Sequence, residues 1–401
     1  MKTGLQNSKK SLWRSMENSS ICPSSELCGG CLYQGVEYSE QLRIKENEVR
    51  SYLENNGIDP GLLIGIKPCP VITSYRNKME YSFGDQVKGG EMHLGLHQRG
   101  HFMNIIDVSS CSLVTDDFNT LIKATLEFAN EKFYVHYNKK SHKGFLRNLI
   151  IRRGVRTGQL LINIVTSSEE VFDGESYKEK LLSLKLQDEI VGILHTISDT
   201  VADVVKCDSM DIIYGRDYYE EIISGLKFKI GPFSFFQTNV DAAERLYSDA
   251  VSLIDHIDGK TVFDLYCGTG TISQIVAKNA KKVIGVEIVE EAVNTARESA
   301  ILNNIDNCTF IAEDVNKALS SIEDKPDVII VDPPRSGIVP KAMKQILSYG
   351  VDQIIYISCN PKTMAVNIKN ALEEGYRIEH LMAYDNFPMT KHIESVCLLT
   401  K

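Results

Sequence analysis

The chain has 401 residues, of which 43% are hydrophobic and 24% are charged, a composition typical of a globular protein with two or three domains. Its polar N-terminal stretch, Met1 to Ser20, lacks the apolar segment of a signal peptide, and no apolar run is long enough to span a membrane. We therefore expect a cytoplasmic protein without a membrane partner. In that compartment its ten cysteines indicate metal binding or catalysis rather than disulfides.

The net charge of −9 is unevenly distributed along the chain. Residues 1–160 hold 21 Lys and Arg against 16 Asp and Glu, a net charge of +5. The remaining residues hold 23 against 37, a net charge of −14. This asymmetry predicts that the first part of the chain meets a polyanion.

Three cysteines lie close together near the N-terminus, in the order Cys22-x5-Cys28-x2-Cys31. Two glycines before the third cysteine allow the loop to wrap around one metal centre. We predict Cys111 as the fourth ligand, because it closely follows a strand-like segment at 103–108, and Cys69 is the alternative. Such a set binds Zn²⁺ or an iron–sulfur cluster; the long x5 spacing favours the cluster but leaves both open.

The segment from residue 66 to 229 reads as short strands separated by turns, which predicts a β-rich domain. A helix at 39–56 precedes it, and we expect that helix only to pack against the fold. Residues 132–156 contain eight basic residues, no acidic ones, and four aromatic residues. Because cations hold phosphates and aromatic rings stack on unpaired bases, this stretch predicts RNA binding by a domain spanning residues 1–232.

From residue 261 onward, strands and helices alternate, which predicts an α/β fold with a doubly wound, Rossmann-like parallel sheet. An aromatic-rich junction at 232–240 separates this region from the β-rich part, so we place the second domain at 233–401. The last strand, at 394–400, is expected to run antiparallel at or near an edge of the sheet.

Four successive strands of this domain end in glycine or acidic residues, at the edge of the sheet where ligands bind. Gly268 and Gly270 allow close approach to a helix N-terminus, but the dinucleotide pattern G-x-G-x-x-G is absent. Glu287 can bind both ribose hydroxyls, and Asp314 can accept from an adenine amino group. With Asp332 ending the fourth strand, the set fits an adenosyl ligand without a pyrophosphate, and it resembles class I S-adenosylmethionine-dependent methyltransferases.

A cysteine ends the following strand of the same sheet. Residues 353–357 form an apolar run, and Ser358-Cys359-Asn360-Pro361 then forces a turn. Cys359 is therefore expected at the ligand-binding edge, where a thiolate can act as a nucleophile. A buried structural cysteine is the alternative interpretation.

Taken together, these motifs resemble the RNA uracil-C5 methyltransferase family, and more narrowly its iron–sulfur branch that modifies 23S ribosomal RNA. The resemblance runs from Cys22 to Leu399. It rests on the cysteine set and on Tyr75-Arg-Asn-Lys, Phe236-Gln237-x-Asn239, Asp264-Leu-Tyr-Cys-Gly-x-Gly, Asp332-Pro-Pro-Arg, Ser358-Cys-Asn-Pro and Phe387-Pro-x-Thr-x-His-x-Glu394. It implies a [4Fe–4S] cluster on Cys22, Cys28, Cys31 and Cys111.

The resemblance also implies the roles of individual site residues. The positions that match the family's contacts to S-adenosylmethionine are Gln237, Tyr266, Glu287 and Asp332. Cys359 matches the nucleophile that adds to C6 of uracil, and Glu394 matches the base that removes the C5 proton. RNA is the implied partner, and we expect the protein to act as a monomer.

Other functions remain as alternatives. Only 21 residues precede Cys22, so the small RNA-binding β-barrel that often begins family members is expected to be missing, and a transfer RNA loop is the alternative substrate. Adenine amino-methyltransferases carry a stacking aromatic residue where this chain has Arg335, and RNA cytosine-C5 methyltransferases carry a second cysteine that is absent near Pro333. Outside enzymes, the alternative is a catalytically silent RNA-binding protein.

Overall fold

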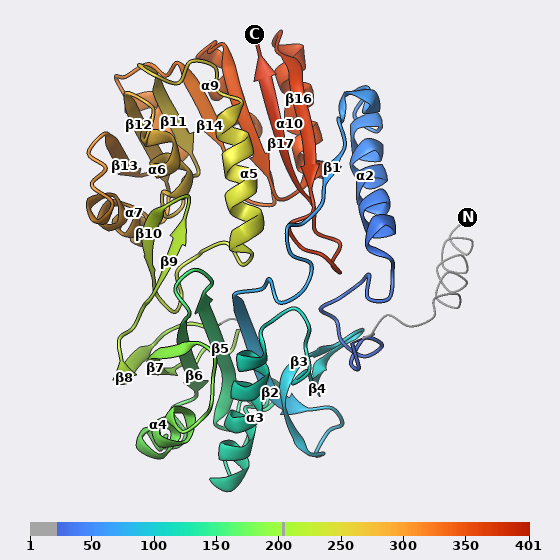
Figure 1. Cartoon of the computed structure of the whole chain (residues 1–401), viewed down its shortest axis with the longest axis vertical. Helices are drawn as coiled ribbons and strands as arrows, with labels where there is room; N and C mark the ends of the chain where they lie inside the picture. The colour runs from blue at the N-terminus through green and yellow to red at the C-terminus, as the bar shows by residue number, and fades with distance from the viewer. Residues whose placement is uncertain (1–21, 203–204) are drawn as a thin grey trace. The chain divides into compact units, whose positions relative to one another are not determined.

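The computed structural model describes residues 22–202 and 205–401, and this part of the chain divides into two compact units (Figure 1). Unit 1 holds the described residues of Met1–Tyr38 and Ile72–Glu221 together with Ile230–Phe233. Unit 2 holds Ser39–Val71, Ile222–Lys229 and Ser234–Lys401. The predicted division at residues 232/233 therefore misses that Ser39–Val71 fold with the C-terminal part of the chain. The stretch Met1–Ser20, predicted not to be a signal peptide, lies outside the described residues.

Unit 1 is a seven-stranded sheet with two helices, in the spatial order β4-β3-β2-β5-β6-β7-β8. Neighbouring strands run antiparallel except β6 and β7, which are parallel and joined through a helix. Its elements are β2 Lys78–Asp85, β3 Met92–Gln98, β4 His101–Asp107, α3 Asp116–Glu131, β5 Leu146–Gly154, β6 Gln159–Thr166, α4 Gly174–Leu182, β7 Glu189–Ile197 and β8 Ser209–Gly215.

The sequence predicts the strands of unit 1 but not its two helices. The antiparallel pairing of β2 with β3 and of β5 with β6 agrees with the predicted short strands separated by turns. Phe118 and Leu121 of α3 and Tyr177 and Leu181 of α4 are fully buried in the same hydrophobic core as the sheet. The helices therefore supply the apolar layer that the sheet needs in order to bury its face.

Unit 2 is built on an eight-stranded sheet in the spatial order β1-β16-β17-β15-β14-β11-β12-β13. Its strands are β1 Ile66–Lys67, β11 Thr261–Leu265, β12 Lys282–Glu287, β13 Cys308–Ala312, β14 Val328–Val331, β15 Gln353–Ser358, β16 Arg377–Tyr384 and β17 Glu394–Thr400. Its helices are α2 Tyr38–Glu54, the 3₁₀ turn Pro60–Leu62, α5 Val240–Ser252, α6 Thr271–Ala277, α7 Glu290–Leu302, α8 Val315–Ser321, α9 Pro340–Ser348 and α10 Pro361–Glu373. Strands β9 Tyr219–Ile223 and β10 Leu226–Ile230 form a separate two-stranded sheet.

The order of the strands in unit 2 creates a binding edge. Strand β11 pairs in parallel with β12 on one side and with β14 on the other, so the direction of winding reverses at β11. In open α/β sheets the crevice at such a switch point, outside the carboxyl ends of the strands, is where ligands bind. Strands β14 and β15 are buried along their whole length, as expected for a parallel sheet covered on both faces.

The last strand runs antiparallel, as predicted, but it does not form an edge. Strand β17 lies between β15 and β16 and pairs with both in the antiparallel sense. Strand β16, which the sequence reading missed, then pairs in parallel with the two-residue strand β1, the blue segment beside the red strands in Figure 1. Because β17 is reversed, its first residue rather than its last lies at the binding edge of the sheet.

Among the described residues, no helix combines the length and the apolar character that a membrane crossing requires.

Candidate active site

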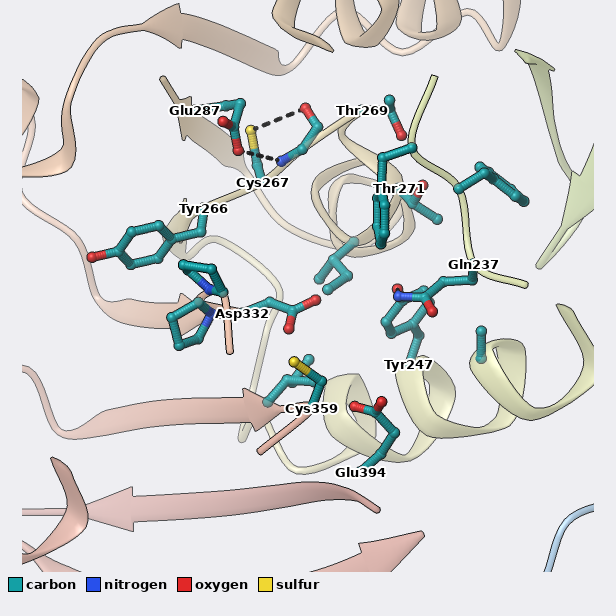
Figure 2. A pocket seen from close by; sticks show the side chains of 18 of the residues that line it. Gln237, Tyr247, Tyr266, Cys267, Thr269, Thr271, Glu287, Asp332, Cys359 and Glu394 are labelled. Carbon is teal, nitrogen blue, oxygen red and sulfur yellow. Dashed lines mark hydrogen bonds between the residues drawn. The ribbon is translucent and has the colours of Figure 1, made fainter. Parts of the chain in front are cut away.

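A cavity of about 660 Å³ opens at the carboxyl ends of the parallel strands of unit 2. Eight of the nine predicted catalytic and donor-binding residues line it: Gln237, Tyr266, Gly268, Glu287, Asp314, Asp332, Cys359 and Glu394. Figure 2 shows the side chains of Asp332, Cys359 and Glu394 converging on this space. Residues separated by more than 150 positions in the sequence are thus brought to one site by the order of the strands.

The loop after β11 approaches the cavity with its backbone. Gly268 has φ 53° and donates its N–H to the Glu287 carboxylate at 3.1 Å, one of the contacts drawn in Figure 2. Gly270, the ninth predicted residue, does not line the cavity. It caps α6 with φ 74°, and a Cβ there would lie 2.7 Å from the Phe310 ring. Gly270 is therefore needed for the close packing of this loop against Phe310.

Two acidic residues stand at the ends of β12 and β13. The Glu287 carboxylate also accepts the N–H of Val289 at 3.0 Å, so its position is fixed from two sides. Asp314 caps α8 by accepting the N–H of Asn316 at 3.0 Å. Oδ1 of Asp314 also accepts from the side-chain amide of Asn316 at 3.2 Å, which leaves Oδ2 for a further donor, and each oxygen of Glu287 keeps a lone pair, as binding of hydroxyl or amino groups requires.

Cys359 and Glu394 come to the cavity from two neighbouring strands. Ser358 of β15 pairs with Ser395 of β17, so the residue that follows Ser358 and the residue that precedes Ser395 lie at the same end of this antiparallel pair. Strand β15 contributes the residue after its last position, and the reversed β17 contributes its first. A thiol and a carboxyl group therefore face one cavity from adjacent strands.

Burial opposes charge on the acidic groups of this cavity. It raises the pKa of Asp332 to about 7 and holds the pKa of Glu394 well above its usual range. Burial also raises the pKa of the Cys359 thiol to about 11, and the charges of Glu394 and Asp332 add to this effect. The Arg335 guanidinium acts in the opposite direction on the pKa of both Cys359 and Glu394.

Arg335 is a cation close to the Cys359 thiol. Its Nη2 lies 3.0 Å from Nδ1 of His392, and its backbone carbonyl accepts from the side chain of Asn360, the residue after Cys359. These contacts fix the turn that follows β14 beside the turn that carries the thiol.

Tyr247 and Asn386 are among the lining residues that sequence reasoning did not single out. Tyr247 of α5 is buried, and its hydroxyl accepts the side-chain N–H of Gln237 at 2.9 Å. The charges of Asp332 and Glu394 help to raise the pKa of this tyrosine, so its hydroxyl lies near both carboxyl groups. Asn386 lines the cavity from the segment before β17. Tyr247 lies ten residues after Gln237, in the helix that follows it, and this short separation is the signal that could have identified it.

The cysteine-rich loop of unit 1 packs on the hairpin of β3 and β4. Cys28 forms an isolated bridge with Gln98, and Arg99 donates to the Cys31 carbonyl at 2.6 Å. The pKa of Cys31 is raised by burial and then by the charges of Cys111, Cys28 and Cys22, so these four thiols lie near one another. Even so, within residues 22–202 and 205–401 no three His, Cys, Asp or Glu side chains converge tightly enough to hold a metal ion.

Cys69, the alternative fourth ligand, has other contacts. Its sulfur accepts from the Asn239 side chain at 3.3 Å and donates to the Val71 carbonyl at 3.0 Å, both within unit 2. It is also buried.

The basic stretch 132–156 does not form one continuous exposed surface. Arg152 is only 2% exposed and donates to a backbone carbonyl, and Arg153 forms an ion pair with Asp188. Lys140 and Lys143 remain exposed. The predicted RNA surface is therefore restricted to part of this stretch.

The fold and the cavity define a class. A cavity lies at the switch point of a mixed α/β sheet. Acidic residues stand at the ends of β12, β13 and β14, and a glycine-containing loop follows β11. This is the arrangement of S-adenosylmethionine-dependent methyltransferases.

Comparison with known proteins identifies the family within this class. A sequence model of the family described as tRNA (Uracil-5-)-methyltransferase matches residues 200–401. An uncharacterized RNA methyltransferase of Clostridium tetani is 48% identical over 375 residues, covering 94% of this chain and 82% of the relative. Another from Clostridium acetobutylicum is 45% identical over 380 residues, covering 95% and 83%.

A solved structure supports the same assignment. The Pyrococcus abyssi tRNA (uracil-54, C5)-methyltransferase, crystallised with S-adenosyl-L-homocysteine, is 27% identical with a TM-score of 0.77 and is matched over 94% of this chain and 87% of that one. The chain belongs to the tRNA (uracil-5-)-methyltransferase family, and it is an S-adenosylmethionine-dependent RNA uracil-C5 methyltransferase.

Proposed function

We propose that Cys359 and Glu394 carry out methylation at C5 of one or more uridines, with 23S ribosomal RNA as the substrate. The observation that carries this proposal is the pairing of Ser358 with Ser395, which sets a thiol and a carboxyl group at one end of two adjacent strands. Uracil is flat, and a nucleophile at C6 together with a base at C5 must reach neighbouring carbons of the same ring.

The chemistry requires one thiolate and one base. The Cys359 thiolate adds to C6 of uracil, and the electron pair of the C5–C6 double bond moves toward C5 and O4. S-adenosylmethionine supplies the electrophilic methyl group that C5 takes up. The Glu394 carboxylate then removes the C5 proton, the double bond re-forms and the C6–sulfur bond breaks to release the thiolate.

The donor has candidate ligands on this chain. Glu287 and Asp314 keep acceptor lone pairs at the ends of β12 and β13, where they can accept from ribose hydroxyls and from an adenine amino group. The Gly268 backbone leaves room for close approach, since a Cβ at this position would meet no atom of the described residues within 4 Å. Gln237, Tyr266 and Asp332 complete the proposed contacts on the lining of the cavity.

The nucleophile can be tested directly. We expect Cys359→Ala to abolish methyl transfer, because no other group can form the C6 bond, while donor binding persists. Methyl transfer to RNA from labelled S-adenosylmethionine measures this. Cys207→Ala, at an exposed cysteine of unit 1, serves as the matched control and should be fully active. Turnover by Cys359→Ala would refute the assignment.

The base has a different signature. Glu394→Gln should form the C6 bond and accept the methyl group but fail to lose the C5 proton, so protein and RNA remain covalently joined. The adduct is detected as a band that survives denaturation on a gel. Glu373→Gln, at the exposed end of α10, should turn over without adduct. The same adduct distinguishes an enzyme from a silent RNA-binding protein, which forms none even on 5-fluorouridine RNA.

The RNA substrate is the second question. Transfer RNA is the second candidate, because the Pyrococcus abyssi relative acts on transfer RNA. Unmodified 23S ribosomal RNA and transfer RNA transcripts are incubated with labelled S-adenosylmethionine, and the labelled nucleoside is mapped. We expect 5-methyluridine in an unpaired segment of ribosomal RNA, because the base must leave any helix to reach Cys359. Label only in transfer RNA would keep the chemistry and refute the ribosomal substrate.

We also propose that Cys22, Cys28, Cys31 and Cys111 hold a [4Fe–4S] cluster. The four thiols influence one another's pKa, so they lie near one another, and thiolates are the ligands that such a cluster takes. The role we assign to the cluster is to tie the loop to the end of β4, because methyl transfer requires no electrons.

The cluster proposal has a spectroscopic test. Protein reconstituted with iron and sulfide under anaerobic conditions should show the broad visible absorption of a cluster and about four irons per chain. Cys111→Ser should lose most of this absorption, whereas Cys69→Ser, in unit 2, should keep it. Stoichiometric zinc without iron in protein purified anaerobically would contradict the proposal.

A further inference from the structure

Helix α2 buries polar as well as apolar side chains on the face that packs against the fold. Gln41 and Lys45 are both fully buried, in line with Val49 and Leu53, whereas Leu42 is only half-buried. A buried charge is costly unless it is paired, and even a paired one contributes little net stability compared with an apolar residue of the same size. A lysine at this position therefore calls for a role other than packing.

The partner of Lys45 is far away in the sequence. Its Nζ lies 2.6 Å from Oδ1 of Asp385, and neither side chain is exposed. The same Nζ donates to the backbone carbonyl of Phe387 at 3.2 Å, and the Phe387 N–H donates to Asp385 Oδ1 at 3.2 Å. The ion pair thus binds both the carbonyl and the N–H of Phe387, just after β16.

Gln41, one helical turn before Lys45, binds the backbone of the same segment through its side chain. Its Oε1 accepts the N–H of Met389 at 2.8 Å, and its Nε2 lies 3.2 Å from the sulfur of that residue. Met389 has φ 66°, a left-handed conformation that is unfavourable for methionine and is kept only where surrounding contacts enforce it. Gln41 supplies such a contact.

The segment held in this way forms one wall of the active-site cavity. It connects β16 to β17 over residues 385–393, and Asn386 and Phe387 line the cavity. Asn239, the N-cap of α5, holds the Asn386 carbonyl at 2.7 Å from the other side. Glu394 directly follows the segment and pairs with Tyr384 across the hairpin.

We propose that Lys45 and Gln41 are positioning residues for proton removal: by fixing residues 385–390 they set where the Glu394 carboxylate stands relative to C5 of the bound uracil. The inference rests on the proposed roles of Cys359 and Glu394. Neither Lys45 nor Gln41 lines the cavity, so both act through the segment between β16 and β17. Cys359 is positioned by β15 and by the turn after it, so its position does not depend on the contacts of Lys45 and Gln41.

This difference gives the proposal a kinetic signature. When Glu394 is displaced, the thiolate still adds and the methyl group is still transferred, but the C5 proton leaves slowly. Displacement of a catalytic group by about 1 Å can cost about a hundredfold in rate. The methylated, covalent protein–RNA complex should therefore accumulate on natural uridine, whereas a general loss of structure would lower adduct formation and turnover together.

The experiment compares Lys45→Met and Gln41→Leu with Lys344→Met, a matched control at an exposed lysine of α9. For each variant, steady-state methyl transfer, the fraction of protein in denaturation-resistant adduct, donor affinity and cooperative thermal unfolding are measured. We expect Lys45→Met to turn over roughly a hundredfold more slowly with most of the protein in the adduct. Gln41→Leu should show the same pattern with a smaller loss, and Lys344→Met should match the unmodified chain.

The outcomes separate this inference from the proposed function. If folded Lys45→Met or Gln41→Leu turns over normally, or loses turnover without adduct while donor affinity is unchanged, the positioning role is wrong. If Lys45→Met does not fold, because it leaves Asp385 charged and unpaired in the core, Gln41→Leu decides, since it removes no charge. Methyl transfer by Cys359→Ala, measured alongside, would instead overturn the proposed function itself.

Discussion

At the scale of single residues, burial and a nearby cation have opposite effects on the pKa of the Cys359 thiol. The raised pKa of the Cys359 thiol means that only a small fraction is thiolate near neutral pH, and that fraction grows about tenfold per pH unit below the pKa. The charge of Arg335 opposes this shift. The rate of attack on uracil is therefore expected to depend on pH and on this arginine together.

Arg335→Met should raise the pKa of Cys359 further and slow adduct formation on 5-fluorouridine RNA at pH 7.5. Because the loss lies in ionisation, a higher pH should restore the rate, and Arg335→Lys should fall between the two. The pH profile of adduct formation, measured by quenching and denaturing gel, tests this. An unchanged profile with a uniformly lower rate would show that the guanidinium acts on RNA binding instead.

The protonation of Asp264 makes the stability of the fold depend on pH. Its side chain is fully buried; Oδ2 accepts from Ser273 at 2.5 Å, and Oδ1 has no hydrogen-bond partner among the described residues. Burial raises its pKa to about 7, whereas an unfolded aspartate titrates near 4. The folded chain thus holds a proton that the unfolded chain has lost, so this carboxyl stabilises the fold below about pH 4 and that contribution disappears as the pH rises through 7.

Asp264→Asn should remove this pH dependence. Relative to the variant, the unmodified chain should lose on the order of 1 to 3 kcal/mol of stability between pH 5 and pH 8, from the 1.36 kcal/mol that each pKa unit represents. Urea unfolding without donor at several pH values provides the measurement. A constant stability difference across this range would mean that Asp264 is ionised in the folded chain at all of them.

At the scale of elements, two glycines two residues apart have different functions. Both have positive φ, but a Cβ at Gly270 would lie 2.7 Å from Phe310 and 2.9 Å from Ala296, whereas at Gly268 it would meet nothing within 4 Å among the described residues. Sequence inspection groups them in one motif, and only the packing of α6 separates them.

Gly270→Ala should therefore destabilise unit 2 by roughly 2 to 4 kcal/mol, since overpacking adds to the cost of a left-handed alanine. Gly268→Ala should cost about 1 kcal/mol in stability but weaken donor binding, because the new methyl group enters the cavity. Denaturant unfolding and calorimetric titration with S-adenosylhomocysteine measure the two effects. Equal stability losses would refute the distinction.

The part of this site that could be predicted from the sequence is the part that is local. Glu287, Asp314, Asp332 and Cys359 each follow an apolar run, so their place at one edge needs only the rule for parallel strands. Glu394 needed the family resemblance, because its strand is reversed. The contact of Lys45 with Asp385 spans 340 positions, and no local periodicity carries such information.

At the scale of the whole molecule, unit 2 is discontinuous in sequence. Val49 and Leu53 of α2, with Ile58 and Leu63 after it, belong to the same core as the central strands. Burial of four such side chains contributes roughly 6 to 12 kcal/mol, which is comparable to the whole stability of an ordinary domain. The C-terminal part of the chain is therefore not expected to fold by itself.

A fragment of residues 234–401 should lack a cooperative thermal transition, although it contains every residue proposed to act on the methyl donor and the uracil. Addition of a peptide covering residues 38–71 should restore cooperative unfolding, because it supplies α2 and β1. Circular dichroism against temperature measures both. A sharp transition in the fragment alone, close to that of the full chain, would contradict this expectation.

The pairing of Ile66 with Ala383 has a consequence for the order in which the protein forms during synthesis. Helix α2 and β1 leave the ribosome early in synthesis. Their apolar face stays uncovered until β16, the strand that pairs with β1, has been made more than 300 residues later. Glu394 begins β17, the strand that pairs with β16, so it reaches its place only after that strand has been made. The apolar face of α2 is therefore uncovered for most of the time during which the chain is being made.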